Sequence, residues 1–363
     1  MAAIIAGIAY LAWRAVETRA GVPAWLWWPA FLVEALGVAG VSVLLLALRR
    51  PPQEIDASRP ATAKVDVMIR VQDEPVGRLV ATLAGLRHTK GVASSTILLF
   101  DFRPEITALA EEHGIAVMSV DPAGDSTGLK TALQVGRSPF VALLDAGDVP
   151  LHGFADVLVR HAYDGHVAGV RGAVGAWSTD SAEHDSRGRH ELRFEREVLN
   201  PAAGQAAVLS GSGVLLRRWA VDHVGVPSGP RRTAELRLSL RLRAAGLRVV
   251  APAAPVLVSA FSANNASSVA RERRRDTAAV LSMLRSTDGP IFTRGLGLGD
   301  RIAILGTCVR PLSGLRRAAF LAIITTALVV GRLPLAAAPV AFAAFWAPMM
   351  VFQSLALRSA SLG

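Results

Sequence analysis

The chain has 363 residues, 52% of them hydrophobic, and its mean hydropathy is +0.38, which excludes an ordinary soluble protein. Its 39 Lys and Arg residues against 29 Asp and Glu residues give a net charge of +10. Only three of the basic residues are lysine, and such a bias can reflect coding composition. With no recognised motif and no interleaved aromatic residues, nucleic acid is not an expected partner. Cys308 is the single cysteine, so no internal disulfide can form.

The apolar residues gather at the two ends of the chain. Residues 2–13 are apolar but reach only about half of the ~20 residues of a spanning helix, whereas residues 24–48 are long enough to span. Without a basic leading region or a small-residue cleavage site, residues 2–13 favour a membrane helix over a signal peptide. Tryptophans open the second segment and suit the headgroup level, although a tryptophan cluster in a protein core is the alternative. Glu34 is costly in lipid and is expected to face another helix.

Basic residues after the second apolar segment outnumber those before it, four to two: Arg49, Arg50, Arg59 and Lys64 against Arg14 and Arg19. This asymmetry predicts an integral membrane protein of the bacterial inner-membrane type with its globular domain in the cytoplasm. Near the other end, residues 300–312 predict an interfacial helix, and residues 315–330 and 335–355 predict two spans. The expected organisation is a membrane segment over 1–50, a cytosolic domain over 51–290 and a second membrane segment over 291–363.

Between residues 65 and 250, short apolar runs alternate with amphipathic stretches. This alternation predicts an α/β fold with a mostly parallel sheet covered on both faces. The predicted strands are residues 65–71, 96–101, 115–120 and 140–145. The predicted helices between them are residues 76–87, 104–113 and 128–136. The polar stretch over residues 177–204 predicts an insertion at one rim of the sheet.

The central stretch is the apolar run 140–144, which ends in Asp145, Ala146, Gly147 and Asp148. It predicts a buried strand that emerges at the carboxyl edge of the sheet, where open α/β folds place ligands. Carboxylates held there can chelate a divalent cation, and the cation can bind a diphosphate. The alternative is a solvated turn, since turns favour Asp and Gly anyway.

Asp101 and Glu235 also fall at predicted strand or helix ends. Sugar transfer from a nucleotide donor needs a metal ion to offset the charge of the diphosphate leaving group. It also needs a carboxylate base to accept the proton of the acceptor hydroxyl. Glu235 is a candidate for that base, although a carboxylate that opens a helix also complements the helix dipole. The charged stretch before residue 277 has a plain interpretation as a solvated or membrane-surface helix. The glycines at 295–299 follow no strand, so they do not indicate a dinucleotide site.

The order of these segments resembles the membrane-bound family 2 glycosyltransferases related to the bacterial cellulose synthase catalytic subunit. The resemblance covers nearly the whole chain, and six stretches carry it: DVMIRVQDEP (66–75), FDFRPE (100–105), residues 141–151, SGSGVLLRR (210–218), TAELRLSLRLR (233–243) and PLSGLRR (311–317). It implies a nucleotide-sugar domain of the GT-A type flanked by transmembrane helices. It also implies a hexosyltransferase that works in polysaccharide biosynthesis.

By position, Asp101 resembles the family's nucleotide-contacting aspartate and Asp145 the first aspartate of its D-x-D metal motif. Glu235 falls at the base position, and Arg275 matches the arginine of Q-x-x-R-W, whose segment lines the acceptor and diphosphate region. Asp148 stands one residue beyond the second metal aspartate and is the expected replacement for it. The resemblance thus implies Mg²⁺ or Mn²⁺ and a nucleotide-sugar donor, such as a UDP-sugar.

Several departures from the family pattern fall on the chemistry. The family's P-T-Y-N-E-P is replaced by residues 70–75, which read RVQDEP, and its lysine-containing stretch by residues 125–127. Gly147 stands at the second D-x-D aspartate, the base is Glu instead of Asp, and Asp276 replaces the tryptophan of Q-x-x-R-W. Losing one electrostatic contact of this kind typically costs about 10²–10³ in rate.

Two functions follow from these observations. The first is an inverting membrane glycosyltransferase that uses a nucleotide sugar to make or extend a glycan, with a glycan or lipid acceptor. The second is a catalytically inactive scaffold or partner subunit of a polysaccharide synthase complex, which the departures favour. Both imply contact with membrane lipids.

Overall fold

The computed structural model describes most of the chain between residues 2 and 331. The described ranges are 2–17, 19, 22–47, 63–177, 208–209, 211–252, 255–260, 266–298, 300–301, 304–305 and 312–331. The chain divides into two compact units, one formed by Met1–Arg49 with Leu305–Gly363 and the other by Arg50–Ile304. The second unit thus extends beyond the predicted domain end at residue 290. The predicted span over 335–355 and the rim insertion after residue 177 lie outside the described residues.

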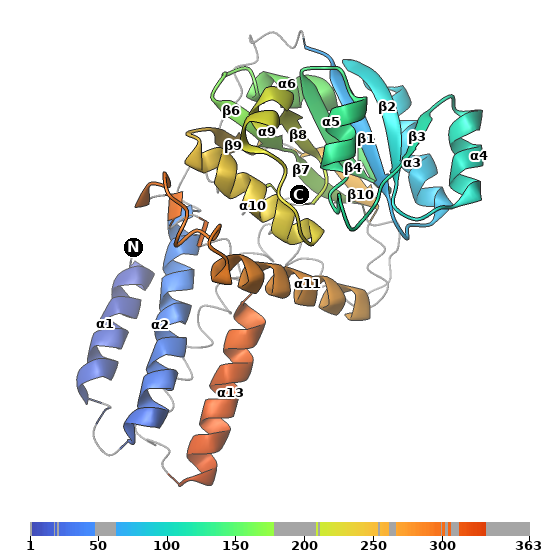
Figure 1. Ribbon diagram of the computed structural model, residues 1–363. Coiled ribbons are helices and arrows are strands. Elements are labelled where there is room, and N and C mark those ends of the chain that lie inside the picture. Colours follow the sequence, from blue (N-terminus) through green and yellow to red (C-terminus); the bar gives the residue numbers. More distant parts are fainter. Residues whose placement is uncertain are drawn as a thin grey trace. The chain divides into compact units, whose positions relative to one another are not determined.

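The first unit contains α1 (Ala2–Glu17), α2 (Ala24–Ala47) and α13 (Ser313–Val329) (Figure 1). Arg14 Nε of α1 donates a hydrogen bond of 3.1 Å to Glu34 Oε2 of α2, and the Tyr10 hydroxyl donates one of 3.0 Å to the same oxygen. Glu34 therefore faces another helix, as its position in an apolar segment predicted. Within the described parts of the chain, no helix is long and apolar enough to cross a lipid bilayer.

The second unit is built on a seven-stranded sheet. Its strands, in spatial order, are β3 (Ala116–Ser119), β2 (Val92–Leu99), β1 (Val65–Val71), β4 (Phe140–Asp145), β8 (Val214–Arg217), β6 (Val167–Arg171) and β9 (Arg248–Val250). All neighbours pair in parallel except β8, which is antiparallel to both β4 and β6. The predicted α/β class and mostly parallel sheet are confirmed. The strand predicted over residues 96–101 is displaced, because β2 spans Val92–Leu99. It begins in a partly exposed, polar stretch and ends before Asp101.

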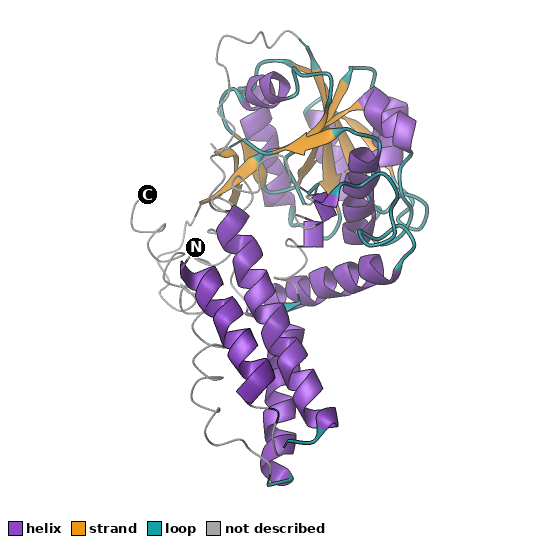
Figure 2. Cartoon of the chain, turned by 90° about the vertical axis from the view of Figure 1, so that its left-hand side faces the viewer, coloured by secondary structure: helices purple, strands orange, loops and turns teal. Residues whose placement is uncertain are grey.

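Helices cover both faces of this sheet (Figures 1 and 2). One apolar core packs the sheet against α3 (Val76–Arg87), α4 (Pro104–Glu112) and α6 (Phe154–His161). The other packs the opposite face against α5 (Leu129–Val135), α9 (Arg218–Val224) and α10 (Arg231–Ala244). The side chains of β1 alternate between the two cores, which explains why the whole strand is apolar apart from two charged residues.

A smaller sheet lies beside the large one and has the order β5 (Asp148–Pro150), β10 (Pro255–Ala260) and β7 (Ala173–Trp177). Strands β5 and β10 are antiparallel, and β10 and β7 are parallel. After β10 the chain enters α11 (Ala266–Arg285), which packs against α10. Because β5 starts only three residues after β4 ends, the chain between them turns sharply at the carboxyl edge of the large sheet.

The register at that edge positions the candidate site. Strands β1 and β4 are adjacent and parallel, with Arg70 paired to Asp145. Gly211–Gly213 lead into β8 on the other side of β4, and the Gly213 N–H donates to the Leu143 carbonyl at 2.9 Å. Residues from distant parts of the sequence therefore meet at the ends of β1, β4 and α10.

Replacing Gly213 with alanine is expected to destabilise this edge. Gly213 has a positive φ of +72°, and an added Cβ would overlap the side chain of Leu257. A left-handed conformation alone costs an alanine about 1–2 kcal/mol, and overpacking adds about 1–3 kcal/mol. Gly153→Ala is the matched control, since Gly153 has φ +79° but no atom within 4 Å of the added Cβ. Urea unfolding followed by circular dichroism would contradict this account if both variants lost equal stability.

Candidate functional site

Arg70 is the most buried charged side chain at the carboxyl edge of the sheet, with 1% of its surface exposed. Its Nε donates to Asp145 Oδ1 at 2.8 Å, and its Nη2 donates to the carbonyl oxygen of Gly211 at 2.8 Å. Its Nη1 lies 3.3 Å from Glu235 Oε1. A buried guanidinium is tolerated only when its donors and its charge are satisfied, and here both conditions are met.

Asp145 closes β4 and accepts hydrogen bonds on both carboxylate oxygens. Arg231 Nη2 donates to Oδ1 at 2.8 Å and to Oδ2 at 2.6 Å, while Arg70 also binds Oδ1. Burial alone would raise the pKa of Asp145, but the positive charges of Arg231 and Arg70 outweigh it and hold that pKa well below its ordinary value of 3.8. Asp145 is therefore a fixed anion at neutral pH.

Glu235 lies in the second turn of α10 and faces the same arginines. Its Oε1 accepts from Arg231 Nε at 3.1 Å, and its Oε2 accepts the backbone N–H of Gly211 at 3.0 Å. Arg232 Nη1 lies 3.6 Å from Oε2. Burial would raise the pKa of Glu235, but the neighbouring arginines lower it below its ordinary value of 4.5. The position is thus suited to an anion that anchors arginines.

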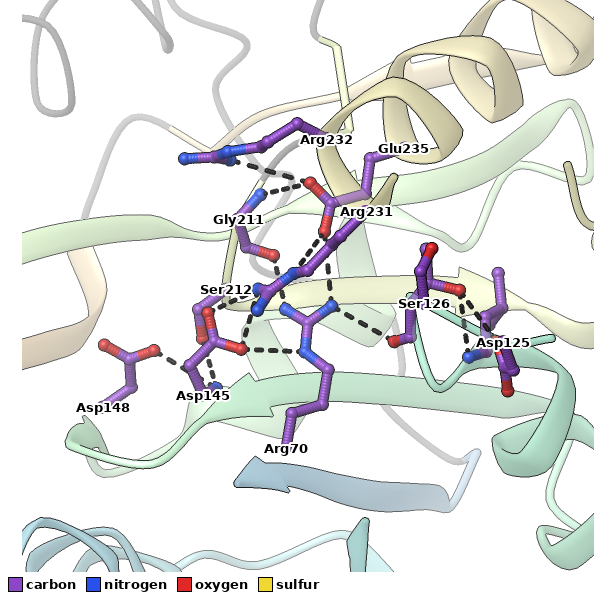
Figure 3. A network of polar contacts seen from close by, with 12 residues as sticks. Arg70, Asp125, Ser126, Asp145, Asp148, Gly211, Ser212, Arg231, Arg232 and Glu235 are labelled. Carbon is purple, nitrogen blue, oxygen red and sulfur yellow. Dashed lines mark hydrogen bonds and ion pairs between the residues drawn. The ribbon is translucent and has the colours of Figure 1, made fainter. Parts of the chain in front are cut away.

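Together these five residues form an arginine–carboxylate cluster: Arg70, Asp145, Arg231, Arg232 and Glu235. Figure 3 shows Arg70 and Arg231 lying between the two carboxylates, which come from β4 and α10. The sequence brought Asp145 and Glu235 into one predicted site, and the structure places them together. It joins them through guanidinium groups.

A divalent cation does not fit the donors around Asp145. Both of its carboxylate oxygens already accept arginine N–H groups, and a cation there would displace Arg231 and face the buried charge of Arg70. Asp148 turns its Oδ2 toward the backbone N–H of Asp145, at 3.4 Å. Among the described residues, no group of three or more Asp, Glu, His or Cys side chains converges as metal ligands do. The metal roles of Asp145 and Asp148 stay predictions that this geometry does not favour.

The other two predicted site residues lie outside the cluster. Asp101 is exposed in the loop that joins β2 to α4, and Arg275 is exposed on α11. Their roles toward the nucleotide and the acceptor stay predictions.

The loop before α5 also supports the cluster. Buried Asp125 accepts hydrogen bonds from the Thr131 N–H at 2.8 Å and the Thr131 hydroxyl at 3.0 Å. The Thr127 carbonyl oxygen, in the same loop, lies 3.5 Å from Arg70 Nη1, and the Ser126 hydroxyl donates to the carbonyl of Gly229 before α10. These contacts fix the loop that replaces the family's lysine-containing stretch.

A cavity of about 20 Å³ lies directly beside the cluster, between α10 and strands β4 and β8. Glu235, Gly211 and Thr127 form its polar part, and the rest of its lining is apolar. Ligand pockets usually enclose about 300–1,000 Å³, so this cavity has room for a single water molecule but is far too small for a nucleotide. Any nucleotide must bind on the solvent side of the cluster or open it.

Sequence reasoning missed Arg70 and Arg231 as site residues. A signal existed for each: Arg70 is one of two charged residues in a mostly apolar strand, and Arg231 precedes Glu235 by one helical turn. Neither signal reveals that both side chains meet Asp145.

No family model matches the sequence. The chain is 24% identical over 384 aligned residues to a UDP-forming cellulose synthase catalytic subunit of Komagataeibacter sucrofermentans, across 97% of this chain and 49% of that protein. It is 26% identical over 300 residues to the corresponding Xanthomonas axonopodis pv. citri subunit, across 79% of this chain and 40% of that protein. The chain therefore spans about half the length of the curated relatives it matches, or less.

Among solved structures, the fold is similar to the mannosyltransferase PcManGT from Pyrobaculum calidifontis, which was determined in complex with GDP-Man and Mn²⁺. The TM-score is 0.59 at 18% identity, over 91% of this chain and 98% of that one. The chain is thus similar in sequence to cellulose synthase catalytic subunits and in fold to a glycosyltransferase, which supports a divergent glycosyltransferase of the GT-A type. At the end of β1 the chain has Val71 and Gln72 where the resemblance predicted a threonine and an aromatic residue, and Arg70 directly precedes them.

Asp145→Asn is expected to lower the free energy of unfolding by about 3 kcal/mol, because it leaves the buried guanidinium of Arg70 without its main counter-charge. Asp101→Asn is the matched control and should stay within about 0.5 kcal/mol of the wild type, since Asp101 is exposed and outside the cluster. Hydrogen exchange of the β1 and β4 amides measures the effect at the site itself. Equal protection in the two variants would contradict the structural role of the cluster.

The lowered pKa values of Asp145 and Glu235 also predict acid sensitivity. The pKa values of these two carboxylates are lower in the folded state than in the unfolded chain. Each carboxylate therefore stabilises the folded protein at pH values above its ordinary pKa, and this stabilisation is lost as the pH falls. Stability should therefore decrease as the pH falls below about 5, through the ordinary values of Glu and Asp. The decrease should be shallower in Asp145→Asn, whose side chain does not titrate. Unfolding measured from pH 7 to pH 3 tests this, and parallel curves would contradict it.

Proposed function

We propose that this chain is a glycosyltransferase that binds a nucleoside diphosphate sugar at the carboxyl edge of the seven-stranded sheet and transfers the sugar with inversion. The GT-A-type fold supports this proposal, since open α/β sheets bind ligands at this edge. The observation that carries it is the convergence of Asp145 and Glu235 with three arginines at that edge. Arginine is well suited to phosphate because its planar donors match phosphate oxygens.

In this proposal Glu235 is the general base that accepts the proton of the acceptor hydroxyl. Its carboxylate is ionised at neutral pH, as a base must be, and it must exchange an arginine partner to act. Asp101 contacts the nucleotide from the loop after β2, and Arg275 contacts the acceptor or the diphosphate. The acceptor is a glycan or a lipid.

The second candidate is a catalytically inactive scaffold or partner subunit of a polysaccharide synthase complex. One observation favours it: both carboxylates are saturated by arginines, beside a cavity of about 20 Å³. In a scaffold the cluster holds the strand ends together and needs no ligand.

We also propose that the first unit associates with a membrane. Several apolar side chains of its helices are exposed, among them Ile5, Val16, Trp25, Leu32 and Leu321. An apolar surface of this kind indicates a lipid or protein partner. Retention in the membrane fraction after carbonate extraction is the expected result, and full release of the chain would contradict it.

Release of nucleoside diphosphate from UDP- and GDP-sugars distinguishes the two functions. An enzyme should release one nucleoside diphosphate per sugar transferred, and Glu235→Gln should slow release by about 10²-fold or more, because it removes the base. Glu105→Gln is the matched control: Glu105 is a surface carboxylate paired with Arg103 at 2.9 Å, and its loss should leave release unchanged. Absence of both nucleotide binding and turnover with every donor would refute the enzyme and favour the scaffold.

A further inference from the structure

We infer that the guanidinium group of Arg231 takes the place of a divalent cation in this site, so that a nucleoside diphosphate binds without metal. The inference deepens the proposed function and rests on it. It names the ligand class, a diphosphate, and the group that contacts it.

Arg231 already holds the position that a metal would need at Asp145. Its Nη2 spans both carboxylate oxygens, at 2.8 and 2.6 Å, and its Nε binds Glu235 at 3.1 Å. The two carboxylates are thus bridged by one planar cation, as two acidic ligands are bridged by a metal ion. A metal cation would have to break these hydrogen bonds in a partly buried site, where breaking ion pairs is costly.

Arg231 also keeps donors for a ligand. Its Nε and Nη2 make every contact found with the described residues, so no described residue accepts from Nη1. About 22% of the side chain is exposed to solvent. The guanidinium can therefore keep its Nη2 hydrogen bonds to Asp145 while its Nη1 hydrogens donate to phosphate oxygens.

The charge of the cluster suits an anion only modestly. Three guanidinium groups against two carboxylates leave a charge of +1, which Asp148, turned to the Asp145 amide, brings to zero. Arg232, one of these three guanidinium groups, is 28% exposed in its side chain and stands beside Arg231 in sequence. Binding should therefore depend on the geometry of Arg231 more than on net charge.

Other arginines of the same helix do not fit this role. Arg241 pairs with Asp288 at 3.2 Å, and Arg237 reaches the Ser228 carbonyl at 3.4 Å, both away from the cluster. Arg70 is fully buried, with its donors directed to Asp145, Glu235 and backbone carbonyls. Arg231 alone, among the described residues of α10, joins both carboxylates and faces solvent.

Calorimetric titration of the full, detergent-purified chain with UDP and with GDP tests this, once in EDTA and once with Mn²⁺. The wild type should bind equally well in both buffers. Arg231→Ala should weaken binding in EDTA by about tenfold or more, the loss expected for a hydrogen bond to a charged group. Arg241→Ala is the matched control and should bind as the wild type does. Arg231→Lys keeps the charge but loses the fork geometry, so its affinity should fall between those of the wild type and Arg231→Ala.

Each possible result supports or overturns the metal-free binding of a nucleoside diphosphate. Hydrogen exchange of β1 and β4 identifies a variant that fails to fold, and Arg231→Lys then carries the comparison. Binding that requires Mn²⁺ and is lost in Asp145→Ala would overturn the inference and leave the proposed function standing. Metal-independent binding that neither Arg231 variant weakens would also overturn it. Absence of binding in both buffers would overturn the proposed function together with the inference.

Discussion

The arrangement at the carboxyl edge of the sheet depends on one buried cation. Arg70 is the second-last residue of the mostly apolar strand β1 and is almost fully buried, so its charge must be neutralised inside the protein. Asp145 and Glu235 provide that neutralisation from the neighbouring strand and from α10. Two carboxylates beside one guanidinium would leave an excess of negative charge. Arg231 and Arg232, which precede Glu235 on α10, compensate this charge. The burial of one side chain thereby determines the partners of all the others.

This constraint changes the chemistry that the fold supports. In a metal-dependent site, carboxylates must be free to bind a cation, whereas here their oxygens are occupied and their pKa values are lowered by arginines. The fold retains the carboxyl edge of the sheet, where ligands bind in open α/β folds, together with a candidate base and partly exposed guanidinium donors. The same contacts also stabilise the edge in the absence of any ligand. An enzyme and a scaffold therefore share this architecture, and they differ in whether Arg231 and Glu235 exchange partners when a nucleotide arrives.

Much of the fold could be predicted from local patterns. The strands at 65–71 and 140–145 and the helix at 76–87 agree with the structure residue by residue, because mostly apolar runs and helical periodicity define them. The resemblance to the glycosyltransferases predicted the GT-A-type fold and brought Asp145 and Glu235 into one site. It also predicted a metal there, where the structure has Arg231. The ion pair between Arg231 and Asp145 joins residues 86 positions apart in sequence, and local patterns carry no information about such contacts.

Diffraction at the manganese absorption edge, from crystals of the full chain soaked in MnCl₂ with and without UDP, would reveal whether Asp145 binds a metal ion. We expect no anomalous peak at metal–oxygen distance, about 2.0–2.6 Å, from the carboxylate of Asp145. The Arg231 guanidinium should remain hydrogen-bonded to both oxygens of that carboxylate. A manganese ion bound to Asp145, with Arg231 turned away, would contradict it.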